Sequence, residues 1–299
     1  MYQELIALMP TDRIIFNEPM HKHTTFKIGG PVDIMVMPQS ADELRQILKI
    51  CADKNIPFLV FGLGSNILVR DKGYKGLVIK LGNSLKQIKV SGNEIYCEAG
   101  VRLSQLARKA ASSNLSGLEF AEGIPGSLGG AIVMNAGAYD GEMKNIVSYV
   151  KAMGPHGEIK DFDSTELEFS YRHSVFQTNG YIVLSAVLKL NYAKAEDIYN
   201  KMRQFARQRR EKQPLEYPSA GSIFRRPPGF YVGPMIEQMG LKGFRIGGAE
   251  VSSKHAGFII NTGNATADDV LQLIKYIQDK AVQQYGVELQ PEIVIIGEE

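Results

Sequence analysis

Two glycine-rich segments are the strongest candidates for chemistry in this sequence. The longer one, Ala121–Ala131, contains four glycines, one proline and one serine in eleven residues. Glycine has no Cβ, so it adopts positive φ and lets another group come close to the backbone. A run this dense is costly in chain entropy. It favours a surface of bare N–H groups fitted to a flat or anionic ligand, and a tight loop between two packed elements is the alternative.

The shorter segment, Gly62–Asn66, resembles a dinucleotide-binding turn only at first sight. That fingerprint needs a third glycine and a helix that opens on the loop. Here Ile67–Val69, the turn Asp71–Gly73 and then Leu77–Leu81 predict strand, turn and strand. The Rossmann fingerprint is therefore excluded, and no P-loop motif is present. Successive N–H groups in such a turn can still bind an anion, and a tight hairpin-like connection is the alternative.

Three later segments place a polar side chain next to a proline or glycine, or between apolar residues: Tyr171–Ser174, Tyr217–Pro227 and Glu288–Glu292. Their candidate residues are Arg172, Ser222 and Glu292. Taken alone, Arg172 is also compatible with a surface ion pair. Ser222 is compatible with a helix cap or turn hydroxyl, and Glu292 with a solvated strand position.

The elements that must position these residues follow from hydrophobic spacing. Strands are predicted at Val32–Met37 and Ile56–Phe61. Between them lies a helix that Ser40 and Glu43 open as a capping box, with Glu43 reaching back to the cap. Further strands are predicted at Ile88–Val90, Ile95–Ala99, Val147–Met153, Glu158–Phe162 and Ile182–Leu190, and Leu103, Leu106, Ala107 and Ala110 mark a helix.

The character of the chain changes at about Lys194, and the best domain boundary lies near 193. A long basic helix is predicted to end at Lys212, before Pro214. A second helix begins at Thr266 and stops at Gly286, and Val287–Ile296 closes the chain largely as a strand. The basic cluster on the first helix is Arg203, Arg207, Arg209, Arg210 and Lys212, and such a cluster is more often a solvated helix face than a nucleic-acid site.

Composition limits the function classes. The 299 residues are 44% hydrophobic and 22% charged, which is typical of a globular protein with a real core. The net charge of +2 gives little reason to expect nucleic acid. Two cysteines without CxxC spacing and five histidines without HExxH spacing argue against a disulfide scaffold or a metal site. No signal peptide or membrane span is expected.

Together the motifs resemble one family, UDP-N-acetylenolpyruvoylglucosamine reductase. The resemblance runs in order from about His21 to Glu299. It rests on the segments His23–Pro31, Gly62–Asn66, Gly123–Gly130, Tyr171-Arg172, Ser219–Phe224 and Gln290–Glu292. Each motif is weak alone, and the ordered combination is specific.

The resemblance implies an α+β protein with a two-lobed FAD-binding domain of the PCMH type, also called vanillyl-alcohol-oxidase-like, followed by an α+β substrate domain. The implied domains are an N-terminal extension at 1–21, the FAD-binding domain at 22–193 with lobes 22–82 and 83–193, and the UDP-sugar domain at 194–299.

The resemblance also implies the cofactors and the reaction. NADPH would supply a hydride through non-covalent FAD to the enolpyruvyl ether of UDP-N-acetylglucosamine, giving UDP-N-acetylmuramate for peptidoglycan synthesis. The first glycine loop would meet the FAD pyrophosphate, and the second would lie along the flavin and its ribityl-phosphate arm. The implied cofactor-binding residues are Gly62, Leu63, Gly64, Ser65, Asn66, Gly123, Ile124, Gly126, Ser127, Gly130 and Ala131.

The resemblance gives each catalytic candidate a role. Arg172 would hold and polarise the substrate carboxylate, which suits the fixed charge and fork of a guanidinium. Ser222 would deliver a proton to carbon, and Glu292 would assist from the other side. The implied substrate-binding residues are Tyr171, Arg209, Lys212, Arg225 and Arg226, although a solvated helix face is the alternative for Arg209 and Lys212.

One departure from part of the family concerns the loop after the Ser222 segment. A long-loop branch has an insertion there that closes over the substrate, whereas here only Pro227–Gly233 precedes the helix predicted at Pro234–Met239. The chain therefore resembles the short-loop branch. Arg225 or Arg226 is expected to take part of the diphosphate contact.

Two rival functions stay open from the sequence. One is another oxidoreductase on the same flavin scaffold, and the other is a flavin- or nucleotide-binding module without turnover. The expected partners are the UDP-sugar and NADPH, with no nucleic acid, membrane or metal. A cytoplasmic monomer is expected.

Overall fold

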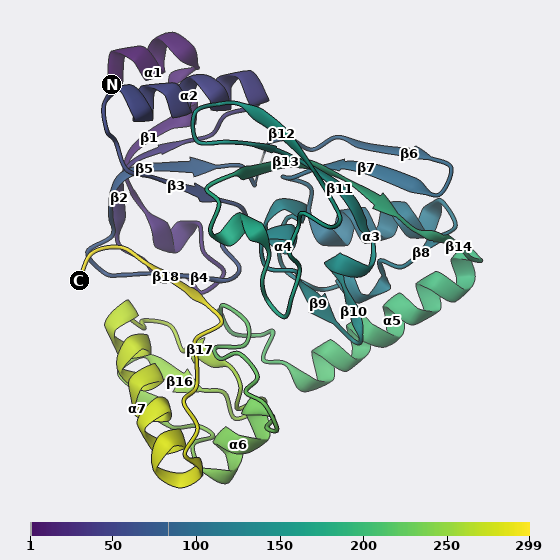
Figure 1. Cartoon of the computed structure of the whole chain (residues 1–299). Coiled ribbons are helices and arrows are strands. Elements are labelled where there is room, and N and C mark those ends of the chain that lie inside the picture. Colours follow the sequence, from purple (N-terminus) through teal and green to yellow (C-terminus); the bar gives the residue numbers. More distant parts are fainter. Residues whose placement is uncertain (1, 83) are drawn as a thin grey trace. The chain divides into compact units, whose positions relative to one another are not determined.

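The computed structural model describes residues 2–82 and 84–299 (Figure 1). Met1 and Asn83, where the expected N-terminal extension and the second expected lobe begin, lie outside the described residues. The chain forms two compact units, each assembled from segments that are distant in sequence. The first unit comprises Met1–Phe16, Ile34–Leu63 and Gly76–Arg209, and the second comprises Asn17–Asp33, Gly64–Lys75 and Arg210–Glu299. The expected boundary near 193 stays a prediction.

The predicted β-α-β unit is present. Helix α2 (Ala41–Asp53) follows β2 in a four-stranded sheet ordered β1 (Ile14–Pro19), β2 (Pro31–Val36), β5 (Tyr74–Lys80) and β3 (Phe58–Phe61). β3 runs parallel to β5. The predicted inward face of α2 is buried with residues of β2 and β5 and with α1 (Tyr2–Leu8). Burial of this apolar face accounts for the position of the helix on the sheet.

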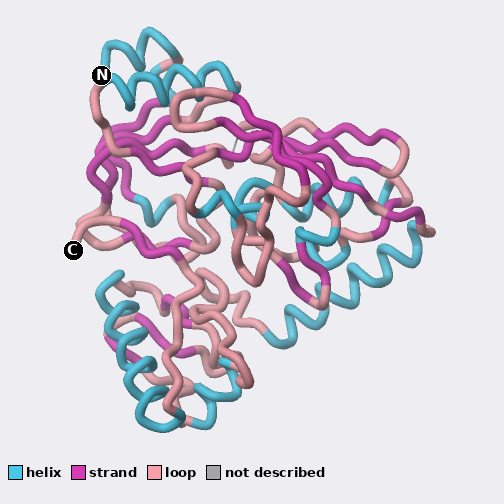
Figure 2. Tube along the Cα trace, viewed as in Figure 1, coloured by secondary structure: helices cyan, strands magenta, loops and turns pink. Residues whose placement is uncertain are grey.

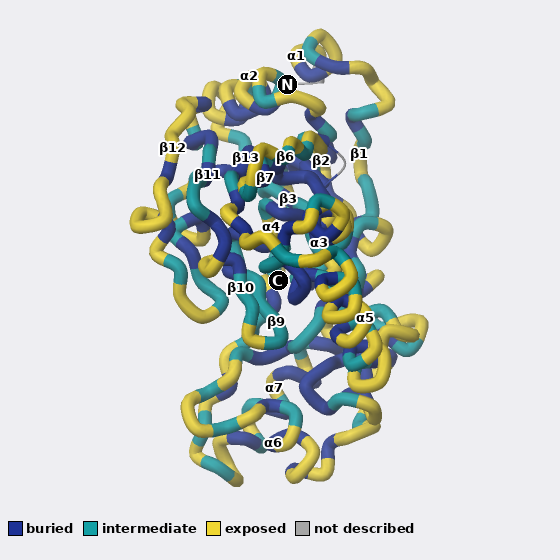
Figure 3. The backbone as a smooth tube through the Cα atoms, turned by 90° about the vertical axis from the view of Figure 1, so that its right-hand side faces the viewer, coloured by how far each residue is buried: buried dark blue, intermediate teal, exposed yellow. Residues whose placement is uncertain are grey.

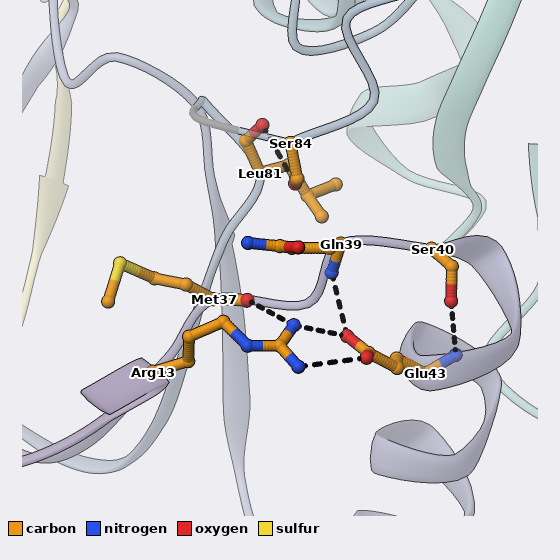
Figure 4. Close-up of polar contacts among 7 residues, drawn as sticks. All are labelled: Arg13, Met37, Gln39, Ser40, Glu43, Leu81 and Ser84. Carbon is orange, nitrogen blue, oxygen red and sulfur yellow. Dashed lines mark hydrogen bonds and ion pairs between the residues drawn. The ribbon is translucent and has the colours of Figure 1, made fainter. Parts of the chain in front are cut away.

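The cap of α2 is only partly as predicted. The Ser40 hydroxyl accepts the Glu43 N–H at 3.1 Å, which confirms the cap. The expected return contact of Glu43 to the cap is wrong (Figure 4). The Glu43 carboxylate instead accepts the Gln39 N–H at 2.8 Å and two bonds from the Arg13 guanidinium, at 2.7 and 3.0 Å. A charged donor offers this carboxylate a stronger interaction than a second amide.

A five-stranded antiparallel sheet forms the centre of the first unit (Figure 2). Its order is β12 (Ile159–Asp163), β11 (Val147–Met153), β13 (Ile182–Lys189), β7 (Glu94–Glu98) and β6 (Ile88–Ser91). The central strand, β13, is buried along most of its length (Figure 3). Helices α3 (Leu103–Ser112) and α4 (Leu128–Val133) contribute to the same core. All five strands and α3 were predicted.

Four short strands and one long helix also belong to this part of the chain. The short strands pair antiparallel as β8 (Leu115–Ser116) with β14 (Asn191–Tyr192), and β9 (Gly137–Ala138) with β10 (Gly141–Glu142). The predicted basic helix is α5 (Ala195–Lys212). Its buried residues are Ile198, Met202, Phe205 and Arg209.

The second unit packs two helices with a small antiparallel sheet. The helices are α6 (Val232–Gln238) and α7 (Ala267–Tyr285), and the sheet is β15 (Arg245–Ile246), β16 (Ala249–Val251) and β17 (Ile259–Asn261). Thr266 and Asp269 form a full capping box on α7, and Gly286 ends that helix at φ +65°, as predicted. β18 (Val294–Ile296) pairs parallel with β4 (Ile67–Val69).

Two expectations about local structure need correction. Val287–Ile296 is a strand only at Val294–Ile296, and before it Pro291 makes an isolated bridge to Phe224. Proline lacks an N–H, so it interrupts a regular ladder. The segment Ala121–Ala131 is a loop only in part, because α4 begins at Leu128. Within the described ranges, no helix has both the length and the apolar character needed to span a membrane.

Candidate functional site

The first glycine loop combines close backbone packing with unused N–H groups. Gly64 has φ +67°, and a Cβ at Gly62 would lie 2.8 Å from the Ser127 hydroxyl oxygen. Gly62 therefore allows the first loop to approach the start of α4 within the first unit. Among the residues that the structure describes, the N–H groups of residues 62–66 find no acceptor. Clustered donors without an acceptor suit an anionic ligand.

In the second glycine loop, several amides are used in hydrogen bonds that build the loop and α4. The Ser127 hydroxyl accepts the Gly130 N–H at 3.4 Å and caps α4. The N–H groups of Ile124 and Ala131 bond to carbonyls within this segment, at 3.1 and 2.9 Å. In the described chain, the N–H groups of Gly123, Gly126 and Ser127 have no such acceptor. Some amides of the segment therefore build the loop, and ligand binding by the other amides stays a prediction.

Arg172 lies in a tight turn of the first unit. Ser170 and His173 exchange hydrogen bonds at 3.2 and 3.1 Å across the turn. Arg172 itself has φ +54°, which a residue with a Cβ adopts at a cost. Its guanidinium donates to the Gly137 carbonyl at 3.4 Å and lies 5.1 Å from the centre of the Tyr171 ring.

Ser222 and Glu292 belong to neighbouring segments of the second unit. The Glu292 N–H donates to the Ile223 carbonyl at 2.7 Å, and the Arg225 N–H donates to the Gln290 carbonyl at 2.8 Å. The two candidates are therefore brought together from positions 70 residues apart in sequence (292 − 222). The Ser222 hydroxyl also donates to the Phe224 carbonyl at 3.4 Å, so the turn-hydroxyl alternative is partly right.

The candidate cations divide into buried and exposed side chains. Arg209 is only 8% exposed, which rules out a solvated position on α5. Burial lowers the pKa of Arg209 from its usual value, while Tyr139 and Glu122 oppose that shift. Lys212 is exposed, as the helix-face alternative requires.

Arg225 is partly buried, whereas Arg226 is exposed. The Arg225 Nε is buried and has no hydrogen-bond partner within the described residues. The exposed Arg226 places its guanidinium carbon 3.8 Å from the centre of the Tyr231 ring, and its Nε donates to the Phe230 carbonyl at 3.2 Å.

Sequence reasoning gave Thr25 no role, although it joins two of the motifs. Its N–H donates to the Gly64 carbonyl at 3.0 Å, and its hydroxyl donates to the Ser219 carbonyl at 2.8 Å. Thr25 thus ties the first glycine loop to the Ser222 segment within the second unit. The only sequence signal for this role is that Thr25 lies within the motif His23–Pro31.

In the described ranges, no group of three or more His, Cys, Asp or Glu side chains is arranged to hold a metal ion. Both cysteines are buried and free.

Comparisons with known proteins cover nearly the whole chain. Residues 32–163 match the FAD binding domain family, and residues 213–296 match the C-terminal domain of UDP-N-acetylenolpyruvoylglucosamine reductase. A UDP-N-acetylenolpyruvoylglucosamine reductase of Syntrophomonas wolfei subsp. wolfei is 59% identical over 299 residues, 100% of both chains. One of Caldanaerobacter subterraneus subsp. tengcongensis is 50% identical over 99% of this chain and 97% of its own length.

Solved structures agree. The crystal structure of the reductase from Thermus caldophilus has a TM-score of 0.81 at 34% identity, over 94% of this chain and 97% of its own. A Phl p 4 variant, a glucose oxidase, has a TM-score of 0.51 at 13% identity over 65% of this chain and 44% of its own, a likeness that shows the fold alone. The predicted fold class is confirmed: a PCMH-type FAD-binding domain is followed by an α+β domain.

Proposed function

Because this chain belongs to the UDP-N-acetylenolpyruvoylglucosamine reductase family, we propose which of its residues carry the reaction of that family. The chain is an FAD-dependent reductase that uses NADPH to convert UDP-N-acetyl-3-O-(1-carboxyvinyl)glucosamine to UDP-N-acetylmuramate, a peptidoglycan precursor. The observation that carries the residue assignment is the backbone pairing that brings the Ser222 and Glu292 segments together.

FAD would be held without a covalent bond by the two glycine loops. The unused N–H groups of residues 62–66 fit the pyrophosphate, and those of Gly123, Gly126 and Ser127 fit the flavin and its phosphate arm. Ile124, Gly130 and Ala131 would contribute close backbone approach rather than N–H donors. Bound FAD would supply the hydride-transfer chemistry that links NADPH to the substrate alkene.

Arg172 would bind the substrate carboxylate and stabilise the negative charge that develops on it and on the adjacent carbon. One well-placed fixed charge of this kind lowers a barrier by about 3 kcal/mol. Ser222 would give its hydroxyl proton to that carbon, and Glu292 would assist as a proton donor on the other side. A serine hydroxyl is a weak acid, so this role requires a strongly basic carbon held about 3 Å away.

The diphosphate and sugar would be held by Tyr171, Arg209, Lys212, Arg225 and Arg226. Arginine and lysine supply the charge that a diphosphate needs. Arg225 supports this assignment best, because its buried Nε lacks a hydrogen-bond partner in the described chain. The short segment Pro227–Gly233 supports the proposed assignment to the short-loop branch.

Several broader features are part of the same proposal. The FAD-binding domain would comprise 22–193, with lobes 22–82 and 83–193, and the UDP-sugar domain 194–299. The chain would act as a monomer and would bind no nucleic acid. It would work in the cytoplasm, where NADPH and UDP-sugars are available. Two buried free cysteines suit such a reducing compartment.

The proposed role of Ser222 is tested by separating the two half-reactions in stopped flow. Ser222→Ala is expected to leave flavin reduction by NADPH intact and to slow flavin reoxidation by the enolpyruvyl substrate about 100-fold or more. Thr262→Ala removes another hydroxyl of the second unit, which donates to the Gly248 carbonyl at 2.9 Å, and serves as control. If both half-reactions of Ser222→Ala match the wild type, Ser222 is not the proton donor.

A further inference from the structure

The backbone of Arg172 is held in place by a side chain from outside its own turn. The Gln177 side-chain amide lies between two carbonyls, donating to Arg172 O at 2.9 Å and to Val133 O at 3.0 Å. An amide nitrogen has two hydrogens, so it can satisfy both acceptors at once. The flipped amide would put an oxygen against two carbonyl oxygens, and the orientation is therefore fixed by its neighbours.

Val133 is the last residue of α4, so its carbonyl has no partner within the helix. The Ser174 hydroxyl, which is fully buried, donates to the same carbonyl at 2.8 Å. The C-terminal end of α4 is therefore fastened to the segment that follows Arg172. The N-terminal end of the same helix carries Ser127, beside the first glycine loop.

A second polar group secures the other side of the turn. Asn135 is fully buried, and its Nδ2 donates to the Ser170 carbonyl at 3.0 Å and to the Glu142 carboxylate at 2.9 Å. Its Oδ1 accepts the Lys144 N–H at 2.9 Å. The turn that contains Arg172 is thus tied on both sides to residues at the end of α4.

The conformation of Arg172 explains why such support is needed. At φ +54° a residue with a Cβ is strained, and such strain persists only where surrounding contacts hold it. Glycine would adopt this φ more cheaply. An arginine in this position indicates that its side chain is required there.

We propose that Gln177 is a positioning residue for Arg172, which holds the strained backbone against α4 so that the guanidinium meets the substrate carboxylate. The inference rests on the proposed role of Arg172 in carboxylate binding. Gln177 is exposed and lies in the short 3-10 helix Val175–Gln177, so the fold survives its replacement. Loss of the amide frees the Arg172 backbone, and small displacements of a substrate-positioning group are costly in rate.

The experiment compares five variants of the FAD-loaded protein: Gln177→Ala, Gln177→Glu, Thr178→Ala, Arg172→Ala and the double variant Arg172→Ala/Gln177→Ala. Thr178 is the matched control because its exposed hydroxyl donates within its own turn, to Val175 O at 3.3 Å. Three quantities are measured: the rate of flavin reduction by NADPH, the rate of anaerobic reoxidation by the enolpyruvyl UDP-sugar, and the Kd of UDP-N-acetylmuramate from the flavin absorbance.

Gln177→Ala is expected to slow reoxidation by about 10- to 100-fold and to weaken binding of the product carboxylate, with reduction by NADPH unchanged. Gln177→Glu keeps the shape but faces two carbonyls with a carboxylate, so its loss is at least as large. Thr178→Ala behaves as wild type. The double variant Arg172→Ala/Gln177→Ala is no slower than Arg172→Ala, because the amide acts only through the arginine.

Wild-type reoxidation in Gln177→Ala and Gln177→Glu, beside a slow Arg172→Ala, would overturn the positioning role and leave the role of Arg172 intact. Equal slowing of both half-reactions, or additive losses in the double variant, would also overturn it, since either indicates general structural damage. A fast Arg172→Ala would overturn the proposed function of Arg172 itself, and the inference with it.

Discussion

Arg226 and Tyr231 form a stacked pair in the short segment that stands where the long-loop branch has its insertion. The Arg226 guanidinium carbon lies over the Tyr231 ring, 3.8 Å from its centre, while the Nε donates to the Phe230 carbonyl. An aromatic ring restrains an arginine without neutralising it. The ring therefore restrains the positive charge that we propose for the diphosphate contact.

We expect Arg226→Ala to raise the Kd of the UDP-sugar about tenfold, because one charge-assisted contact is lost. The measurement is a titration of the FAD-loaded protein with UDP-N-acetylmuramate. Lys275→Ala is the control, since it removes an exposed cation of α7 that pairs with Asp279. An unchanged Kd in Arg226→Ala would assign the contact to Arg225 or to another cation.

The sequence indicated which side chains are candidates for the site, but it did not fix the role of each one. Arg172, Ser222 and Glu292 were each ambiguous in local sequence, and pairing of the Ser222 and Glu292 segments depends on contacts about 70 residues apart. The same limit hid Thr25 and Gln177, whose partners are distant in sequence. Arg209 looked like its basic neighbours on α5, and only packing distinguishes it.

At the scale of elements, α4 joins the second glycine loop to the Arg172 turn. Spacing predicted the long strands and helices because apolar periodicity persists over many residues. It did not predict α4, since a six-residue helix of glycine, alanine and aliphatic residues has too short a pattern. Apolar spacing also predicted too long a final strand, because residues before Val294 pair with the Ser222 segment through an isolated bridge and not through a regular ladder.

Gly130 allows folding and cofactor binding to be separated. A Cβ there would meet only the Ser127 hydroxyl, at 3.7 Å, so the fold has room for a side chain. Gly130→Leu is expected to keep or raise the stability of the apoprotein by up to about 1 kcal/mol, because glycine is a poor helix former. The same variant should lose FAD.

Thermal unfolding of the apoprotein and flavin absorbance after gel filtration measure the two effects. Ser112→Leu, on the exposed end of α3, is the control for helix propensity alone. A Gly130→Leu protein that retains its full content of FAD would contradict the proposed role of this loop in flavin binding.

The Arg13–Glu43 pair links the residues before β1 to the start of α2 and gives stability a pH dependence. The Arg13 guanidinium holds the pKa of the Glu43 carboxyl below its usual value. A lowered carboxyl pKa stabilises the fold above the unfolded-state pKa, and this contribution is lost as pH falls through the lower folded-state pKa.

Glu43→Gln is therefore expected to cost about 1 kcal/mol at pH 7, and the difference from wild type is lost as the pH falls through the lowered pKa of Glu43. Urea unfolding at several pH values measures it. Asp42→Asn, which affects the more exposed Arg45 pair, should change little. A penalty that is constant with pH would show that shape rather than charge matters at this position.

Each of the two compact units is assembled from segments that are discontinuous in sequence. The core of the second unit includes Phe26, Ile28 and Leu68, which precede its C-terminal segment by more than a hundred residues. Asp71 accepts the N–H groups of Ala267 and Asp268 at 2.8 and 2.9 Å and so supports the start of α7. A composition change along the chain cannot reveal such an arrangement, because it reports only neighbours in sequence.

A fragment of residues 194–299 is therefore expected not to fold by itself. It lacks the three buried apolar side chains, the β4 partner of β18 and the Asp71 contact with α7. Circular dichroism during urea titration should show no cooperative transition in the fragment, beside a cooperative one in the full chain. A cooperative transition in the fragment would support an independent domain that begins near 194.

The visible spectrum of the purified protein under anaerobic conditions gives the strongest test of the assigned reaction. We expect a flavin spectrum that bleaches with NADPH and returns on addition of UDP-N-acetyl-3-O-(1-carboxyvinyl)glucosamine, but not on addition of UDP-N-acetylglucosamine, which lacks the alkene. A protein that binds no flavin, or a bleached flavin that the enolpyruvyl sugar does not restore, would contradict it.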